Sequence, residues 1–207
     1  MFKLQIRAII LALFVPLLLS ANHVLTDEIL KPEASKLINT MGLELSSKTG
    51  IHSYVLPTNE HFPVGFNLVE YSKKYEQKMT KPYVLFIFAP NALITEKIET
   101  TGRVGIIPSS DTVRKLYNYE EVRDSALNVI TIKDKNIVED KHNIGVVQAY
   151  SELADQIATT KGIELTTTIP NDTKYIVMVL RVILYAGLLL VIWIYFLRPR
   201  IMKGKDD

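Results

Sequence analysis

The sequence predicts an α/β protein, with a single domain whose mixed β-sheet is flanked by helices on both faces. Segments with helical periodicity alternate with short β-rich runs through the middle of the chain, and the run at 83–89 is continuously apolar. Such a run is typical of a central strand covered on both sides. An N-terminal signal or anchor and one C-terminal transmembrane helix complete the predicted architecture.

The first 21 residues have the features of an export signal. Lys3 and Arg7 precede an apolar run that ends at Leu19, and small residues follow it. A basic, then apolar, then small-residue order is typical of a secretory signal. Residues 1–21 are therefore predicted to be either a cleaved signal peptide or a retained N-terminal anchor, and both place the chain that follows outside the cytoplasm.

The sequence pattern of the first half of the domain predicts a helix, a strand and a second helix. Residues 32–48 form the first helix, because Pro32 suits a first turn and Gly50 follows as a stop. The β-rich run at 51–56 is the strand. Asn67, with a glutamate three residues later, resembles a capping box that begins the second helix. The apolar face of the first helix is predicted from helical spacing to contain Ala34, Leu37, Ile38, Met41 and Leu45.

After the central strand, the pattern continues with one short strand and three helices. The strand is predicted at 104–107 and the long last helix at 143–160, with a charged loop at 133–141 before it. Residues 91–101 are left open between an edge strand and a loop. The two other helices are short and span 111–117 and 119–129. The apolar face of the last helix is predicted to contain Ile144, Val147, Leu153, Ala154 and Ile157.

The second long apolar run, at 176–197, predicts a membrane span. At 1.5 Å per residue, a helix of about 22 residues is about 33 Å long, close to the hydrocarbon thickness of a bilayer. Trp193 and Tyr195 lie near its end, as interfacial aromatics do. The basic residues Arg198, Arg200 and Lys203 follow, so the positive-inside rule places the C-terminus in the cytoplasm.

These features divide the chain and place it in the inner (cytoplasmic) membrane, crossing once if the signal is cleaved. The predicted parts are the signal or anchor at 1–21, a periplasmic or otherwise extracytoplasmic domain at 22–162, a linker at 163–174, the transmembrane helix at 175–197 and a short basic cytoplasmic tail at 198–207. Arg181 lies inside the predicted span. It is interpreted either as snorkelling to the interface or as pairing with an acidic residue of a partner helix.

Composition excludes several classes of function. The chain has no cysteine, which rules out disulfides, thiol catalysis and zinc–thiolate sites. Residues 22–174 carry 17 Lys and Arg against 20 Asp and Glu, a net charge of −3, although the whole chain carries +2. The positive balance therefore comes from the two ends, and it indicates topology rather than nucleic-acid binding.

The order of these elements resembles the TPM domain family, which includes thylakoid-lumen proteins of photosystem II repair and exported bacterial proteins with a C-terminal membrane span. The family has a short extended segment, a helix ending in Lys-Thr-Gly, a strand, a helix, an apolar central strand, a long helix and often an anchor. The matching parts here are Leu25-Thr26-Asp27, Lys31-Pro32-Glu33, Lys48-Thr49-Gly50, 51–56, 68–76, 84–89, 143–160 and 176–197.

The resemblance implies a role in repairing or assisting a membrane complex, and for some relatives a phosphatase activity. Typical members have an acidic residue or Asn and a Gly before the central strand and acidic residues after it, where a divalent cation would find oxygen ligands. Here Thr80-Lys81-Pro82-Tyr83 precedes the strand and Pro90-Asn91 follows it, without an acid. No cofactor or metal is therefore predicted, because the turns beside the central strand do not support a divalent cation.

One polar cluster is a candidate site for an anion or a partner. Arg103 is followed by Ser109, Ser110 and Asp111 immediately before a predicted helix. A helix N-terminus with free N–H groups binds anions, and an arginine adds charge. The alternative interpretation is that Ser110 or Asp111 only caps the helix.

The sequence favours an interaction module over an enzyme. It contains no G-x-S-x-G, P-loop or H-E-x-x-H motif. The first hypothesis is a membrane-anchored periplasmic module that assists the assembly, repair or stability of a membrane protein complex, with that complex and the lipid bilayer as partners. The alternatives are a metal-dependent phosphatase-like enzyme acting outside the cytoplasm and an envelope sensory or accessory subunit. Convergence of Asp111, Glu120 and Asp124 on one pocket would favour the enzyme.

Overall fold

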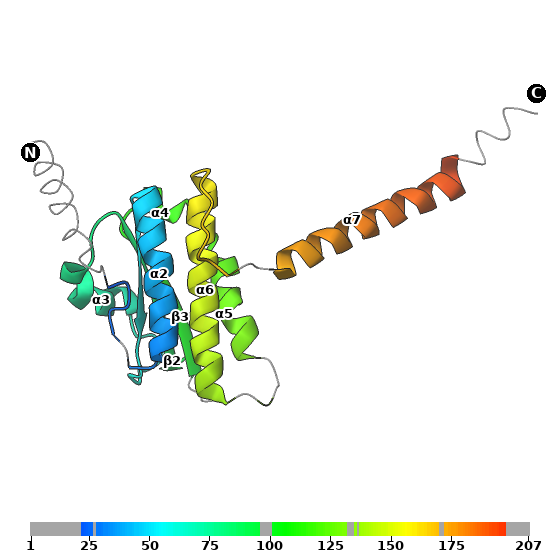
Figure 1. Cartoon of the computed structure of the whole chain (residues 1–207). Helices are drawn as coiled ribbons and strands as arrows, with labels where there is room; N and C mark the ends of the chain where they lie inside the picture. The colour runs from blue at the N-terminus through cyan, green and yellow to red at the C-terminus, as the bar shows by residue number, and fades with distance from the viewer. Residues whose placement is uncertain are drawn as a thin grey trace, which may run out of the picture. The chain divides into compact units, whose positions relative to one another are not determined.

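The described part of the chain forms two compact units that divide after Ile169 (Figure 1). A computed structural model describes residues 22–26, 28–95, 101–131, 135, 137–169 and 172–197. The first unit holds the α/β domain, and the second holds one helix. The predicted signal or anchor at 1–21 and the basic tail with Arg198, Arg200 and Lys203 lie outside the described residues.

The first unit is built on a mixed sheet, as predicted. Its strands in the described residues are β1 (His52–Pro57), β2 (Tyr83–Leu93) and β3 (Thr101–Pro108), in the spatial order β1-β2-β3. β1 pairs parallel with β2, and β3 pairs antiparallel with it. A parallel pair needs a crossover connection, and the chain between β1 and β2 supplies it. The prediction of an α/β fold with a mixed sheet is therefore confirmed.

A short N-terminal segment, residues 22–26, extends this sheet along the free edge of β1. Val24 bridges to Val55 in parallel. The Val55 N–H donates to the His23 carbonyl at 2.8 Å, and the Leu25 N–H donates to the Val55 carbonyl at 2.9 Å. The outer edge of β1 is thereby paired rather than open.

Alternate residues of β2 pack into two separate cores. Val84, Phe86 and Phe88 lie in the core beneath the long helices. Leu85 and Ile87 lie in the second core, beneath the loop at 58–67 and the short helix after it. Side chains of a strand alternate between faces, so a strand that is buried along both faces must be covered on both sides. The continuous apolar run predicted this position correctly.

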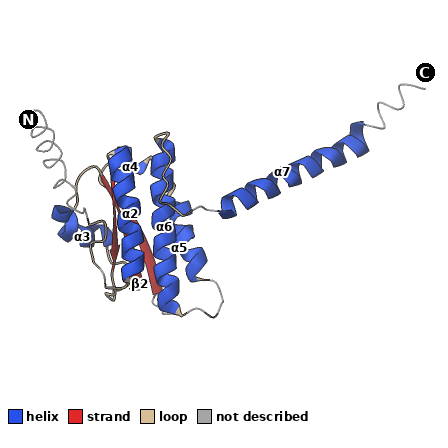
Figure 2. Ribbon diagram, viewed as in Figure 1, coloured by secondary structure: helices blue, strands red, loops and turns tan. Residues whose placement is uncertain are grey.

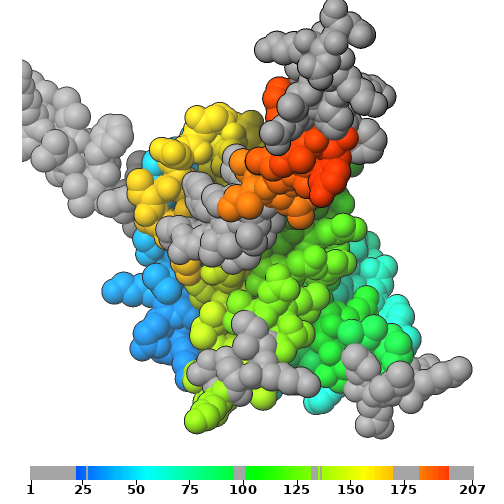
Figure 3. Space-filling view, turned by 90° about the vertical axis from the view of Figure 1, so that its right-hand side faces the viewer, coloured from blue at the N-terminus to red at the C-terminus, as the bar shows by residue number. Residues whose placement is uncertain are grey.

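The helices cover the two faces unequally (Figures 1 and 2). Three longer helices pack on one face, and Figure 3 shows α2 (blue), α6 (yellow-green) and α5 (green) side by side. The other face carries α3, which Asn67 caps by accepting hydrogen bonds from the Val69 and Glu70 N–H groups. The helices of the first unit are α2 (Pro32–Thr49), α3 (Leu68–Ser72), the 3-10 helix η1 (Lys73–Lys78), α4 (Asp111–Arg114), α5 (Tyr119–Ile130) and α6 (Val138–Thr160).

Several element ends differ from the prediction. α4 is a single turn rather than the helix expected at 111–117, and β2 continues to Leu93, into the segment that the sequence left open. α6 begins at Val138, so the last part of the predicted charged loop is helical. Glu139 and Asp140 lie in its first turn, where carboxylates are favoured by the helix dipole. Charge patterning alone had indicated a loop there.

The second unit is the helix α7 (Asp172–Ile192), continued by a π-helical turn at Trp193–Leu197. The described side chains of residues 182–195, including Trp193 and Tyr195, are exposed. The side chain of Arg181 lies outside the description. Within the described residues, no helix meets the combined length and apolarity required to cross a membrane. The membrane span and the localisation stay predictions.

Candidate functional site

The structure does not bring the predicted polar cluster together. Arg103 lies near the start of β3, and Ser109 follows its end. Six residue-to-residue steps along extended backbone place them about 20 Å apart. The Arg103 guanidinium donates to the carbonyl of Phe66 at 2.7 Å, which fastens the loop at 58–67 to β3. Arg103 therefore stabilises the second core, and it does not face the serines.

The other members of the cluster are occupied locally. The Ser109 hydroxyl accepts a hydrogen bond from the Tyr83 N–H at 2.9 Å, and it continues the β2–β3 pairing. The Ser110 hydroxyl accepts from the Val113 N–H at 3.4 Å and caps α4. Asp111 is exposed. The capping interpretation accounts for Ser110, and a helix of one turn offers little dipole for an anion.

The arrangement that would have favoured a metal-dependent phosphatase is not found in the described part of the chain. No group of three or more His, Asp or Glu side chains there is placed to hold a metal ion. Asp111, Glu120 and Asp124 form no such group. The structure therefore gives this alternative no positive support.

A buried polar network joins the N-terminal segment to β1 and α6. His23 is fully buried, and its Nδ1 lies 2.7 Å from the Ser53 carbonyl. Because a carbonyl only accepts, Nδ1 carries the proton. The Tyr150 hydroxyl donates to the same carbonyl at 2.9 Å and accepts from the Ser53 hydroxyl at 2.5 Å. Burial lowers the pKa of His23 and raises the pKa of Tyr150, so both stay neutral at pH 7.

This network has a structural role, because solvent does not reach its polar groups. The side chains of His23, Ser53 and Tyr150 are all fully buried. The network fixes the N-terminal segment against β1, and α2 closes over it at Gly42, whose backbone approaches both His23 and Tyr150. Sequence reasoning did not identify the network, since its members lie far apart along the chain.

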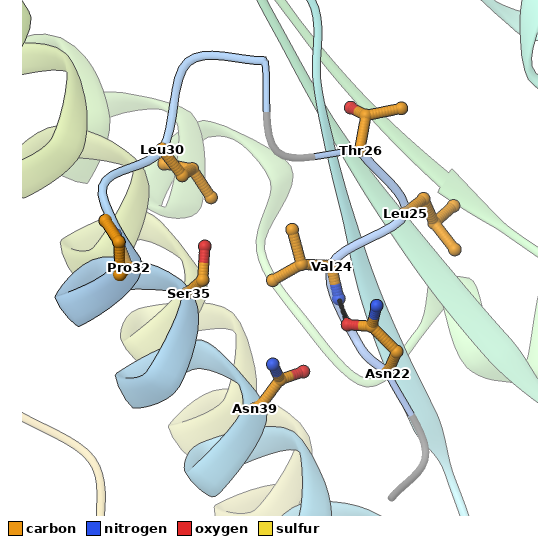
Figure 4. Close-up of a pocket in the computed structure, with 8 residues that line it drawn as sticks. All are labelled: Asn22, Val24, Leu25, Thr26, Leu30, Pro32, Ser35 and Asn39. Atoms are coloured by element: carbon orange, nitrogen blue, oxygen red, sulfur yellow. Dashed lines mark hydrogen bonds between the residues drawn. The ribbon is translucent and has the colours of Figure 1, made fainter.

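A cavity of about 340 Å³ lies between the N-terminal segment and α2 (Figure 4). The Asn39 side chain accepts from the His23 N–H at 2.7 Å on one side of it. The Ser35 hydroxyl is buried without a hydrogen-bond partner. Among the described residues, the lining contains no titratable side chain. It is lined by Asn22, Val24, Leu25, Thr26, Leu30, Pro32, Ser35 and Asn39.

The segment at 163–169, here called the strap, reverses along α6 after that helix ends. Gly162 has φ of +70°, a left-handed conformation that suits glycine and turns the chain. Ile163 and Leu165 then pack against the first core. Further along, the Ile169 N–H donates to the Ser151 hydroxyl at 2.7 Å, and the Thr168 hydroxyl donates to Asp155 at 2.7 Å. The first part of the predicted linker is thus attached to the domain.

A single carboxylate, that of Glu44 on α2, holds the middle of the strap. Thr166 and Thr167 each donate a backbone N–H and a hydroxyl to it, at 2.5 to 3.0 Å. Lys48 donates to it at 2.7 Å. Burial by itself raises the pKa of Glu44, but these donors outweigh burial and hold the pKa well below its ordinary value. The carboxylate is therefore ionised at neutral pH.

Two large aliphatic side chains are exposed on the two helices that hold the strap. Leu37 precedes Glu44 by seven residues on α2, and Ile144 precedes Ser151 by seven on α6, so each lies two turns before a strap contact on the same side of its helix. α2 and α6 run side by side, with Lys31 bonded to Asp140 at their starts. We call the surface of Leu37 and Ile144 the α2–α6 face.

The exposure of the α2–α6 face corrects the sequence prediction. Helical spacing placed both residues on the buried sides of their helices, but Leu37 is 48% exposed and Ile144 is 50% exposed. Both positions lie at the margin of an apolar stripe. Periodicity identifies such a stripe, but it does not show where the neighbouring helix stops covering it.

Comparison with known proteins does not add a family. No family model matches the chain, and no curated protein matches it. The resemblance to TPM domains therefore stays a prediction, and the function is argued from the chain's own residues.

Proposed function

We propose that the protein is a membrane-anchored, extracytoplasmic interaction module that assists the assembly, repair or stability of a membrane protein complex. The observation that carries the proposal is the α2–α6 face, where Leu37 and Ile144 are about half exposed on two packed helices. A contiguous exposed apolar patch favours a protein contact, and in this proposal Leu37 and Ile144 belong to one such patch. The first unit would supply this contact outside the cytoplasm.

The second unit supports the anchorage through its composition. The described side chains of residues 182–195 are exposed and almost all apolar. A helix that is apolar on all sides is stable when protein or lipid surrounds it. In this proposal the run at 176–197 crosses the bilayer, and Arg181 pairs with an acidic group of the partner's helix, which would offset the penalty of a charge within the membrane.

The kind of complex served follows from the TPM resemblance. Repair and accessory proteins of that family act on membrane complexes from the extracytoplasmic side. The proposal assigns the same class of partner here, a membrane protein complex with an exposed extracytoplasmic domain. It requires no cofactor and no nucleic acid.

Replacing Leu37 by aspartate is expected to weaken co-purification of the partner complex at least tenfold, because a charge at the centre of an apolar contact must be desolvated. The measurement is a pull-down of the full-length protein in mild detergent, quantified by mass spectrometry. Leu43→Asp is the matched control, since Leu43 is 41% exposed on the same helix but lies about 120° around it from Leu37. Arg181→Leu tests the membrane contact in the same experiment.

Equal recovery from Leu37→Asp and Leu43→Asp would contradict docking through the α2–α6 face. Failure of the unsubstituted protein to retain any membrane protein would contradict the interaction module itself. Loss only in Arg181→Leu would restrict the contact to the membrane helix.

A further inference from the structure

The strap is attached differently from the rest of the first unit. The N–H groups of Thr166, Thr167 and Ile169 donate to side chains of the two helices, whereas the strands and helices are held by backbone pairing. The strap residues themselves are half-buried or exposed. Ile163 and Leu165 pack against the first core, but no strap residue is fully buried. Segments with few fully buried side chains open locally at free energies below that of global unfolding.

The polar attachment depends strongly on one residue. Four donors from Thr166 and Thr167 converge on Glu44, whose side chain is only 11% exposed. Lys48 donates both to this carboxylate and to the Glu164 carbonyl, so it joins the start of the strap to the same anchor. Loss of the Glu44 charge would therefore weaken all of these contacts together.

We propose that the strap is a releasable tether: residues 163–169 detach from α2 and α6 as a unit while the sheet and helices of the domain stay folded. The turn at Lys161 and Gly162 is the hinge, because it separates the end of α6 from the first strap residue. Detachment uncovers Ser151 and Asp155, two to three turns beyond Ile144 on α6, and it enlarges the α2–α6 face.

Release also lengthens the connection to the second unit. With the strap bound, two residues separate Ile169 from the start of α7. Release adds seven residues, each spanning at most about 3.6 Å, and so up to about 25 Å of additional reach. If the second unit is anchored in a membrane, as proposed above, this reach lets the first unit bind a partner farther from the bilayer. The release of the strap does not depend on that anchorage.

Hydrogen exchange of the full-length protein in detergent, read by mass spectrometry, tests the release. In the unsubstituted protein, the strap amides are expected to exchange faster than those of β2 and α6. Glu44→Gln is expected to speed strap exchange about tenfold further, with β2 and α6 unchanged. Glu33→Gln is the control, because it removes the same charge from an exposed position in the first turn of α2.

Two results would overturn the release. Strap amides that exchange at the same rate as β2 would show that the strap leaves only on global unfolding. If Glu44→Gln accelerated strap exchange no more than Glu33→Gln does, Glu44 would not be the residue that anchors the strap. Thr167→Val, which deletes one donor and keeps the Glu44 charge, should give a smaller acceleration than Glu44→Gln, and an equal or larger one would also count against Glu44.

The added reach has its own measurement. Because the chain has no cysteine, spin labels can be attached to Leu43→Cys in the first unit and Leu188→Cys in the second. The distance distribution between them should broaden in Glu44→Gln, and an unchanged distribution would contradict a longer tether. The exchange rates and the spin-label distances can both be measured without a bilayer. Extraction of the intact protein from membranes at alkaline pH would contradict the membrane anchorage but would not affect the result for the strap.

Discussion

Gly42→Ala is expected to destabilise the domain severely. A Cβ at this position would lie 2.4 Å from His23 Cγ and 2.4 Å from the Tyr150 hydroxyl oxygen. Neither group can retreat easily, because His23 is bonded to Ser53 and stacks on Tyr54 at 5.5 Å, while Tyr150 is fully buried. Overpacking of a rigid core costs roughly 3 kcal/mol, more than the approximately 1 kcal/mol that alanine adds to helix stability.

The free energy of unfolding in urea, measured by circular dichroism, gives the comparison. Gly187→Ala is the control, because a Cβ at that glycine of α7 meets no atom within 4 Å. Gly145→Ala should be intermediate, since its Cβ would lie 3.0 Å from Ile130 and 3.1 Å from the Ala126 carbonyl. If the Gly42→Ala protein were as stable as the unsubstituted one, α2 would not pack as closely on His23 as described here.

Leu85→Ala and Phe86→Ala are both expected to remove much of the stability of the domain, although the two side chains point in opposite directions. Both residues are fully buried, Leu85 in the core beneath α3 and Phe86 in the core beneath α2 and α6. Truncating buried side chains of this size typically costs about 2–5 kcal/mol for leucine and about 3–5 kcal/mol for phenylalanine. The measurement is again urea unfolding of each variant.

Val69→Ala is the control for this pair, because Val69 is 53% exposed on α3 and its truncation should change stability by less than about 0.5 kcal/mol. If Leu85→Ala left the free energy of unfolding unchanged while Phe86→Ala lowered it, the loop at 58–67 and α3 would not cover the second face of the sheet. The expected result is a large loss for both neighbours.

The sequence predicts those parts of the fold that local pattern determines. The apolar run at 83–89 indicated a strand covered on both faces, and its residues do alternate between two cores. Asn67 and the glutamate after it indicated a helix start, and Asn67 caps α3. In both cases the physical cause, strand alternation or a capping hydrogen bond, acts within a few residues.

Other features depend on contacts between distant residues. The strap has a polar, threonine-rich sequence, which indicates a linker. In the structure, however, Thr166 and Thr167 donate hydrogen bonds to Glu44, which lies more than 120 residues earlier in the chain. Spacing also grouped Arg103 with Ser109, and an extended strand places them about 20 Å apart. Leu37 and Ile144 were expected in the core, because the sequence does not show where the cover of a helix ends.

The central claim is that the α2–α6 face contacts a membrane protein. Since the chain has no cysteine, Leu37→Cys and Leu43→Cys can each carry one photoactivatable cross-linker on the full-length protein in isolated membranes. We expect Leu37→Cys to form one discrete cross-link to a membrane protein, and Leu43→Cys on the other side of α2 to form none. The same cross-links from both positions, or none from Leu37→Cys, would contradict the claim.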